Sequence, residues 1–354
     1  MSTTPASRPA ALLGHRLFWP LVILAALLVG NVVFNHDFLA VRVKDGHLYG
    51  SLVDIVHFGA PLMLVSLGLT LVIATGGIDL SVGSVVAISG ALACLWISGQ
   101  DDQGSVGGTV AAVGVALAAS TVLGVWNGVL VARVGVQPII ATLILMVAGR
   151  GIAQLVTDGQ IITISSPPYK LIGGGYWLTL PFSVIVVGVV AVLTGLLTRR
   201  TALGLLVESV GGNAEASRLV GIRSRGLTIM VYTFCSLCAG VAGLMISSNV
   251  SSADGNNAGL WIELDAILAV VIGGTSLNGG RFHLSGTMVG ALIIQTLSTT
   301  VYSTGIPPET TLVFKAVVVT CVCLLQSPAF RAKVFRRRAR REATAVPADA
   351  EAAA

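Results

Sequence analysis

The sequence predicts an all-α integral membrane protein, a polytopic bundle of about ten transmembrane helices, some of them broken. Of its 354 residues, 54% are hydrophobic and 10% are charged, and the mean hydropathy is +0.89. A soluble domain carries about 25% charged residues, so lipid must solvate much of this chain. Its 42 glycines suit close helix contacts within a bilayer. The alternating segments that are typical of a membrane β-barrel are absent from the sequence.

Ten apolar segments follow one another along the chain. Arg8, His15 and Arg16 precede the first, as in a signal peptide, but no small-residue cleavage site follows it, so we expect a retained helix. The eighth is shorter than the roughly 20 residues of a full crossing, and we expect it to be tilted or broken. The predicted spans are 17–35, 52–75, 82–98, 107–132, 137–157, 181–198, 227–248, 262–274, 284–303 and 309–327.

The positive charges predict the orientation of these spans. With both termini in the cytoplasm, 16 of the 21 Lys and Arg residues fall on the cytoplasmic side. This divides the chain into a cytoplasmic tail at 1–16, a transmembrane permease domain at 17–327 and a second cytoplasmic tail at 328–354. The second tail begins with a basic cluster, Arg331 to Arg341, that is a stop signal or attracts anionic membrane lipid. Its remainder is predicted to be disordered, and the net charge of +5 indicates no nucleic-acid partner.

The sequence contains no pattern that predicts chemistry. Cys235 and Cys238 have a CxxC spacing, but they lie in an apolar segment without further ligands, so we expect no metal site. No lysine follows a glycine, which excludes a P-loop. The five histidines are scattered and form no nucleophile–base set. We therefore expect a non-catalytic chain without a cofactor, and any ATP that drives it must bind a separate ATPase.

The loop at 199–226 is the longest predicted cytoplasmic loop between spans. A glycine pair interrupts one helix, an asparagine follows as an N-cap, AEASRLV forms about two helical turns, and a further glycine ends them. A glutamate and an arginine three residues apart share one face and can pair. Such a short helix either connects two spans or docks on a partner ATPase. The residues concerned are Gly211, Gly212, Asn213, Glu215, Arg218 and Gly221.

Two glycine-rich stretches break the helical pattern, GGIDLSVG at 76–83 and GGTSLNGG at 273–280. Broken helices expose backbone groups, which is tolerated only where protein or a water-filled cavity satisfies them. Both stretches lie on the predicted cytoplasmic side, so they are candidates for the inner mouth or gate of a transport pathway. An alternative for the aspartate in the first stretch is an N-cap of the third span. The candidate gate residues are Gly76, Gly77, Asp79, Gly273 and Gly274.

Four ionisable residues lie within or beside the spans: Arg150, Lys315, Glu263 and Asp265. Charges in hydrocarbon are costly and face a protein partner or a wet cavity. We favour structural pairing of the two bases with acidic groups, including Asp54, over a role in lining the path of a hydroxylated solute.

Three motifs carry a resemblance to a known family. They are LVIATGGIDLSVGSVVAISG at 71–90, VGGNAEASRLVGI at 210–222 and ELDAILAVVIGGTSLNGGRF at 263–282. The chain resembles the permeases of ribose/galactose-type ABC sugar importers, over a region from about 52 to 326. Within that group, ATLILMVAGRGIAQL at 141–155 and NNAGLWIELDAILAVVIGG at 256–274 are most similar to the galactofuranose importer permeases.

The resemblance implies a function and a set of partners. It implies a permease of the bacterial inner membrane that works by alternating access with ABC ATPase subunits and a periplasmic sugar-binding protein. A second permease copy or a paralogue completes the assembly, and the binding protein docks on the outer loops at 36–51, 158–180 and 249–261. The 210–222 segment becomes the ATPase-coupling helix. An ion-coupled secondary sugar transporter is the alternative, in which the membrane charges would serve a relay.

Overall fold

The computed structural model describes residues 17–34, 36–44, 46–303 and 310–326. The predicted tails at 1–16 and 328–354, with the basic cluster, lie outside the described residues. The chain divides into two units, 1–300 and 301–354. The predicted fold class is confirmed, because each predicted span coincides with a helix, within a few residues at its ends. The helices at these spans are α2 (Phe18–Phe34), α3 (Ser51–Ala74), α4 (Val82–Ser98), α5 (Val106–Val129), α6 (Pro138–Val156), α8 (Phe182–Arg200), α11 (Ser224–Val250), α12 (Ile262–Ile272), α13 (Leu284–Ser303) and α14 (Thr311–Gln326).

Among the described residues, six helices are long and apolar enough to cross a membrane, namely α3, α5 with its extension, α6, α8, α11 and α13. The helix α12 has 11 residues and spans about 16 Å, half of a hydrocarbon core, so the eighth span is too short for a full crossing, as the sequence predicts. The end of α5 is a π-helical turn, η1 (Leu130–Val134), which stops at Gly135 with φ +83°. Pro138 then begins α6.

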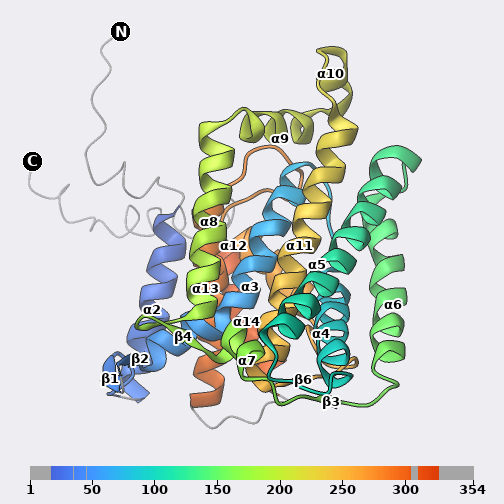
Figure 1. The fold of residues 1–354 in the computed structure, drawn as a ribbon. Coiled ribbons are helices and arrows are strands. Elements are labelled where there is room, and N and C mark those ends of the chain that lie inside the picture. Colours follow the sequence, from blue (N-terminus) through green and yellow to red (C-terminus); the bar gives the residue numbers. More distant parts are fainter. Residues whose placement is uncertain (1–16, 35, 45, 304–309, 327–354) are drawn as a thin grey trace, which may run out of the picture. The chain divides into compact units, whose positions relative to one another are not determined.

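The helix α11 lies at the centre of the first unit and packs against α3, α4 and α5 (Figure 1). Glycines let these helices approach closely: a methyl group on Gly124 or Gly128 of α5 would lie 2.7 Å from a Cα atom of α11. The same holds for Gly286 and Gly290 of α13, where a methyl group would overlap the backbone of Gly273 and Ala269 at α12. Both pairs have the GxxxG spacing that lets helix backbones approach closely, and in the structure both pack helices together.

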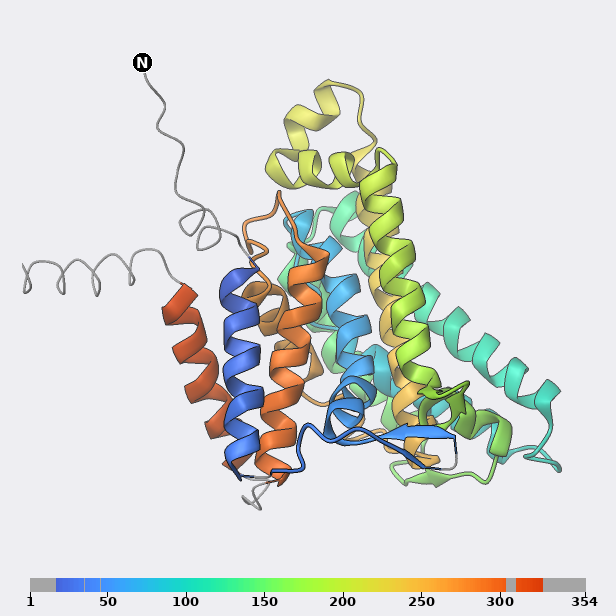
Figure 2. The same cartoon turned by 90° about the vertical axis from the view of Figure 1, so that its left-hand side faces the viewer.

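The two ends of the first unit differ in structure (Figure 2). At one end, which we call the α10 end, α9 (Leu203–Gly212) and α10 (Ala214–Leu219) connect α8 to α11. At the opposite, strand end lie α7 (Pro167–Gly174) and three two-stranded antiparallel sheets, β1–β2, β3–β6 and β4–β5. The strands are β1 (Arg42–Lys44), β2 (His47–Tyr49), β3 (Ile162–Thr163), β4 (Tyr176–Trp177), β5 (Leu180–Pro181) and β6 (Ser252–Ala253).

Candidate coupling and gating site

The α9–α10 elbow has the local structure that the sequence predicts. The Asn213 side chain accepts a hydrogen bond from the backbone N–H of Ala216 at 2.9 Å, which caps α10. The helix ends before Gly221, which adopts φ +91°, a conformation that favours glycine. Glu215 and Arg218 form an ion pair at 3.0 Å on the exposed surface. The predicted N-cap, helix stop and ion pair are therefore confirmed.

The tip of α10 is apolar and exposed. Leu219 is 90% exposed and Val220 is 83% exposed. The elbow projects beyond the ends of α8 and α11, as Figure 2 shows. Two adjacent aliphatic side chains at the point of a projecting elbow are typical of a surface that a partner covers.

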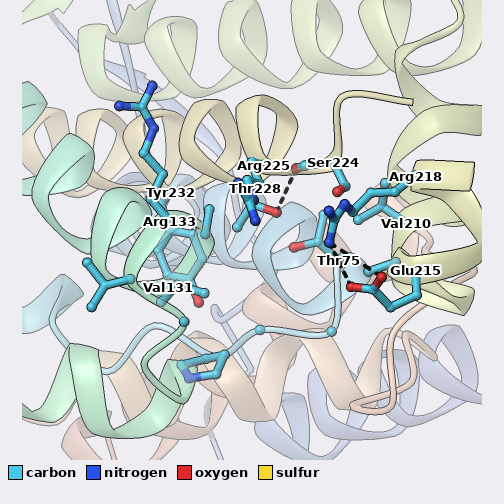
Figure 3. A pocket seen from close by; sticks show the side chains of 17 residues that line it. Thr75, Val131, Arg133, Val210, Glu215, Arg218, Ser224, Arg225, Thr228 and Tyr232 are labelled. Atoms are coloured by element: carbon cyan, nitrogen blue, oxygen red, sulfur yellow. Dashed lines mark hydrogen bonds and ion pairs between the residues drawn. The ribbon is translucent and has the colours of Figure 1, made fainter. Parts of the chain in front are cut away.

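A cavity of about 490 Å³ lies behind the elbow. Tyr232 of α11 borders it on one side and the Glu215–Arg218 pair on the other (Figure 3). Arg133 of η1 and Arg225 at the start of α11 also line it, so the lining is rich in arginine. The first glycine break contributes Gly76 and Gly77 to the wall. The cavity thus connects the elbow, α11 and the first break.

Asp79 is fully buried beside this cavity wall. Its Oδ1 accepts hydrogen bonds from the backbone N–H of Ser81 at 2.9 Å and from the Ser81 hydroxyl at 2.6 Å. The Asn127 amide in turn donates to the Ser81 hydroxyl at 2.8 Å. Since Ser81 occupies the N-cap position and α4 begins at Val82, the interpretation of Asp79 as the N-cap is wrong.

Three polar atoms around the first break have no hydrogen-bond partner within the described part of the chain. They are the second carboxylate oxygen of Asp79, the side-chain amide oxygen of Asn127 and the hydroxyl of Tyr232, and all three are buried. The hydroxyl lies beside the first break, because a methyl group on Gly77 would approach it to 2.5 Å. Buried polar groups usually find partners, so these three atoms mark a place where water or another conformation supplies one.

The second glycine break meets the first at the α10 end. After α12, Gly273 packs against the backbone of α13, and Gly274 adopts φ +86°. At the end of this second break, the backbone N–H of Gly280 donates to the carbonyl of Ala74 at 2.9 Å. Ala74 is the last residue of α3 and lies just before the first break. Gly211 of α9 lies against the same two residues. The structure thus brings together three glycine motifs that are far apart in sequence.

The charged residues of the spans lie elsewhere. Arg150 donates to the carbonyl of Ala258 at 2.7 Å, so backbone carbonyls take the place of the acidic partner that we favoured. Glu263 is 3% exposed and packs against the first turn of α4, close enough to Arg150 for attraction. Asp265 lies in the first turn of α12, and Lys315 lies on α14 in the second unit.

The loop after α11 contains a second ordered carboxylate, Asp254. Burial disfavours its ionised form, but the side chain of Asn257 donates to it at 2.7 Å and the backbone N–H of Asn256 donates at 2.8 Å. Together with the nearby charge of Arg150, these hydrogen bonds hold the pKa of Asp254 below its ordinary value. The loop that Arg150 contacts is therefore organised by ionised groups at neutral pH.

Sequence reasoning did not place Tyr232 or Asn127 in this site, nor Arg133 and Arg225 around the cavity. The two arginines were visible only as part of the positive-inside bias. Tyr232 and Asn127 lie within apolar helices and carry no local signal, so only the packing of α5 and α11 against the first break identifies them.

The helical membrane bundle, the projecting elbow and the paired helix breaks are consistent with a transport permease. The chain belongs to the family described as branched-chain amino acid transport system / permease component, which matches residues 51–323. The expected permease resemblance is confirmed, and members of this family are permease components rather than enzymes.

Several curated relatives are similar over most of the chain. The galactofuranose transporter permease protein YtfT of Escherichia coli K12 is 48% identical, covering 92% of this chain and 96% of the relative. The fructose import permease protein FruF of Bifidobacterium longum is 40% identical, covering 93% of each. The ribose import permease protein RbsC of Escherichia coli K12 is 37% identical, covering 75% of this chain and 81% of the relative. No solved structure matches the chain significantly. The ion-coupled alternative finds no support among these relatives.

Proposed function

We propose that this permease is the membrane subunit of an ATP-driven sugar importer of the bacterial inner membrane, and that its substrate is galactofuranose or a related hexose or pentose. The 48% identity to a galactofuranose transporter permease supports this sugar, and the fructose and ribose import permeases support the wider class. Solute moves by alternating access, and the chain forms no covalent intermediate with it.

The observation that carries this proposal is the projecting α10 elbow. Its helix is capped by Asn213 and carries an ion pair, and exposed Leu219 and Val220 lie at its end. A short helix that fits a cleft on an ATPase needs this ordered backbone and this exposed apolar end. The sequence contains no P-loop, so a separate ATPase subunit must supply hydrolysis. In this proposal the coupling residues are Gly211, Gly212, Asn213, Glu215, Arg218 and Gly221.

The two helix breaks form the inner gate in this proposal, through Gly76, Gly77, Asp79, Gly273 and Gly274. Their position behind the elbow supports this role, because movement of α10 reaches them over a short distance. Arg150, Glu263, Asp265 and Lys315 remain candidates for the pathway, and the backbone contacts of Arg150 favour a positioning role for that residue.

The arginines around the elbow support an orientation with the α10 end in the cytoplasm. The strand end then faces the periplasm, and the predicted docking loops 36–51, 158–180 and 249–261 supply its strands. We propose that a periplasmic sugar-binding protein docks there. A second copy of the permease or a paralogue completes the pathway, and membrane lipid surrounds it.

Reconstitution of the permease with its ATPase and binding protein tests the proposal. We expect the loaded binding protein to stimulate ATP hydrolysis, with galactofuranose the most effective of galactofuranose, galactopyranose, fructose and ribose. Leu219→Asp should abolish ATPase capture by placing a charge in the apolar contact. Leu178→Asp changes a leucine at the strand end that is 77% exposed, and it should leave capture intact. A chain that transports sugar without any ATPase would refute the importer assignment.

A further inference from the structure

The three glycine motifs make backbone contacts with one another at the α10 end. The hydrogen bond from the Gly280 N–H to the Ala74 carbonyl, at 2.9 Å, connects the end of α3 to the chain after α12. Gly279 lies beside it: a methyl group there would come within 2.8 Å of the Gly211 carbonyl oxygen and 3.0 Å of the Gly76 nitrogen. Three chain segments therefore meet with no side chain between them.

Gly211 lies directly over this hydrogen bond. A methyl group at that position would overlap the Ala74 carbonyl oxygen and lie 2.6 Å from the Gly280 nitrogen. Any residue other than glycine must therefore push apart the donor and the acceptor that connect the two breaks. A methyl group on the neighbouring Gly212 would meet nothing within 4 Å. The packing therefore requires glycine at 211 but not at 212.

We propose that Gly211 is the positioning residue of a backbone joint, formed with Ala74–Gly76 and Gly279–Gly280, through which the elbow moves both helix breaks as one body. The proposal rests on the proposed function and specifies how coupling reaches the gate. Side chains can change rotamer and absorb a displacement, whereas backbone atoms in direct contact cannot. A shift of α9 is therefore passed to both breaks.

The position of the joint supports transmission over simple helix packing. Close glycine contacts such as those of Gly124 and Gly128 against α11 lie along the sides of helices within the bundle. The joint instead connects the ends of three elements: α9, which leads to the exposed coupling helix, and the two chain segments that interrupt helices. Contacts at element ends are where hinges and switching motions concentrate.

The variant Gly211→Ala tests the joint in the reconstituted complex. We expect the sugar transported per ATP hydrolysed to fall about ten-fold or more. Gly226→Ala is the matched control, because Gly226 has open space around it near the start of α11, and its transport ratio should be unchanged. Wild-type coupling in Gly211→Ala overturns the proposal. Loss of ATPase capture by the wild-type chain would instead refute the proposed function.

A distance measurement keeps the test independent of whether Gly211→Ala folds. In a background lacking the five native cysteines, spin labels at Gly212→Cys and Asn278→Cys report the separation of the elbow from the second break. A second pair, Gly212→Cys and Val147→Cys, reports the movement of the elbow relative to α6. Between the nucleotide-free and vanadate-trapped complexes we expect the first separation to stay within about 2 Å while the second changes. The proposal is overturned if the distance between labels at 212 and 278 changes by more than about 2 Å. It is also overturned if the distance between labels at 212 and 147 does not change.

Discussion

Removal of the α10 cap is a sharp test of whether the elbow acts as a folded helix. The change Asn213→Ala deletes the oxygen that accepts the Ala216 N–H at 2.9 Å. An N-cap contributes about 1 kcal/mol, whereas the exposed Glu215–Arg218 pair contributes about 0.3–0.5 kcal/mol. A helix of six residues has little other local support, so the cap is its largest local stabilising contact. A loss of about 1 kcal/mol lowers the equilibrium constant between folded and unfolded α10 by about five-fold.

We expect an affinity for the ATPase that is weaker by up to about five-fold, because only the folded helix fits the partner, measured by titrating ATPase onto the permease in nanodiscs. Asn213→Ser is the matched control, because serine caps a helix about as well as asparagine and should bind within about two-fold of wild type. Glu215→Gln should also change affinity by less than about two-fold, since it removes only the exposed ion pair. Equal losses in the alanine and serine variants would refute the reasoning, because the asparagine would then contact the partner directly.

Three further predictions concern the bundle and the strand end. Gly68→Ala places a methyl group 2.7 Å from a Cα atom of α11. We expect it to lower the free energy of unfolding by about 1–3 kcal/mol, which is measured as a lower unfolding temperature in detergent. The control Gly188→Ala, at an open helical position, should be neutral or stabilising. Arg150→Met removes charged hydrogen bonds worth about 1.5–3 kcal/mol, so amide hydrogens of the 254–261 loop should exchange at least about ten-fold faster; unchanged exchange would show that the arginine does not hold the loop. Folding lowers the pKa of Asp254, so its ionised carboxylate stabilises the loop fully above about pH 4. This stabilisation is lost as the pH falls through the lowered pKa. Protection of the loop amides from hydrogen exchange should therefore be constant from neutral pH to about 5 and drop in stronger acid.

Features that depend only on residues close together in the sequence were predictable from it. Each predicted span is a helix because hydrocarbon forces the backbone to satisfy its own hydrogen bonds, whatever packs beside it. The cap at Asn213 and the stop at Gly221 need only a few consecutive residues. The π-helical turn η1, the short helix α7 and the strand pairs were not predicted, because their hydrogen bonds depend on close backbone geometry or on partners distant in sequence, as in β3 with β6.

The candidate site was predictable only in part. Its glycine motifs stand out in the sequence, yet nothing local indicates that 76, 211 and 280 meet, or that Asp79 is buried rather than capping α4. Tyr232 carries no signal at all until α11 packs against the first break.

The sequence by itself determined the membrane solvent, the helical class, the family and the local form of the coupling elbow, because each depends on composition or on residues within a few turns of one another. The tertiary structure decided which glycine of the 211–212 pair is confined, where the buried carboxylate lies and how the two breaks are connected. Those facts follow from contacts between segments more than 60 residues apart, whose pairing only the packed bundle establishes.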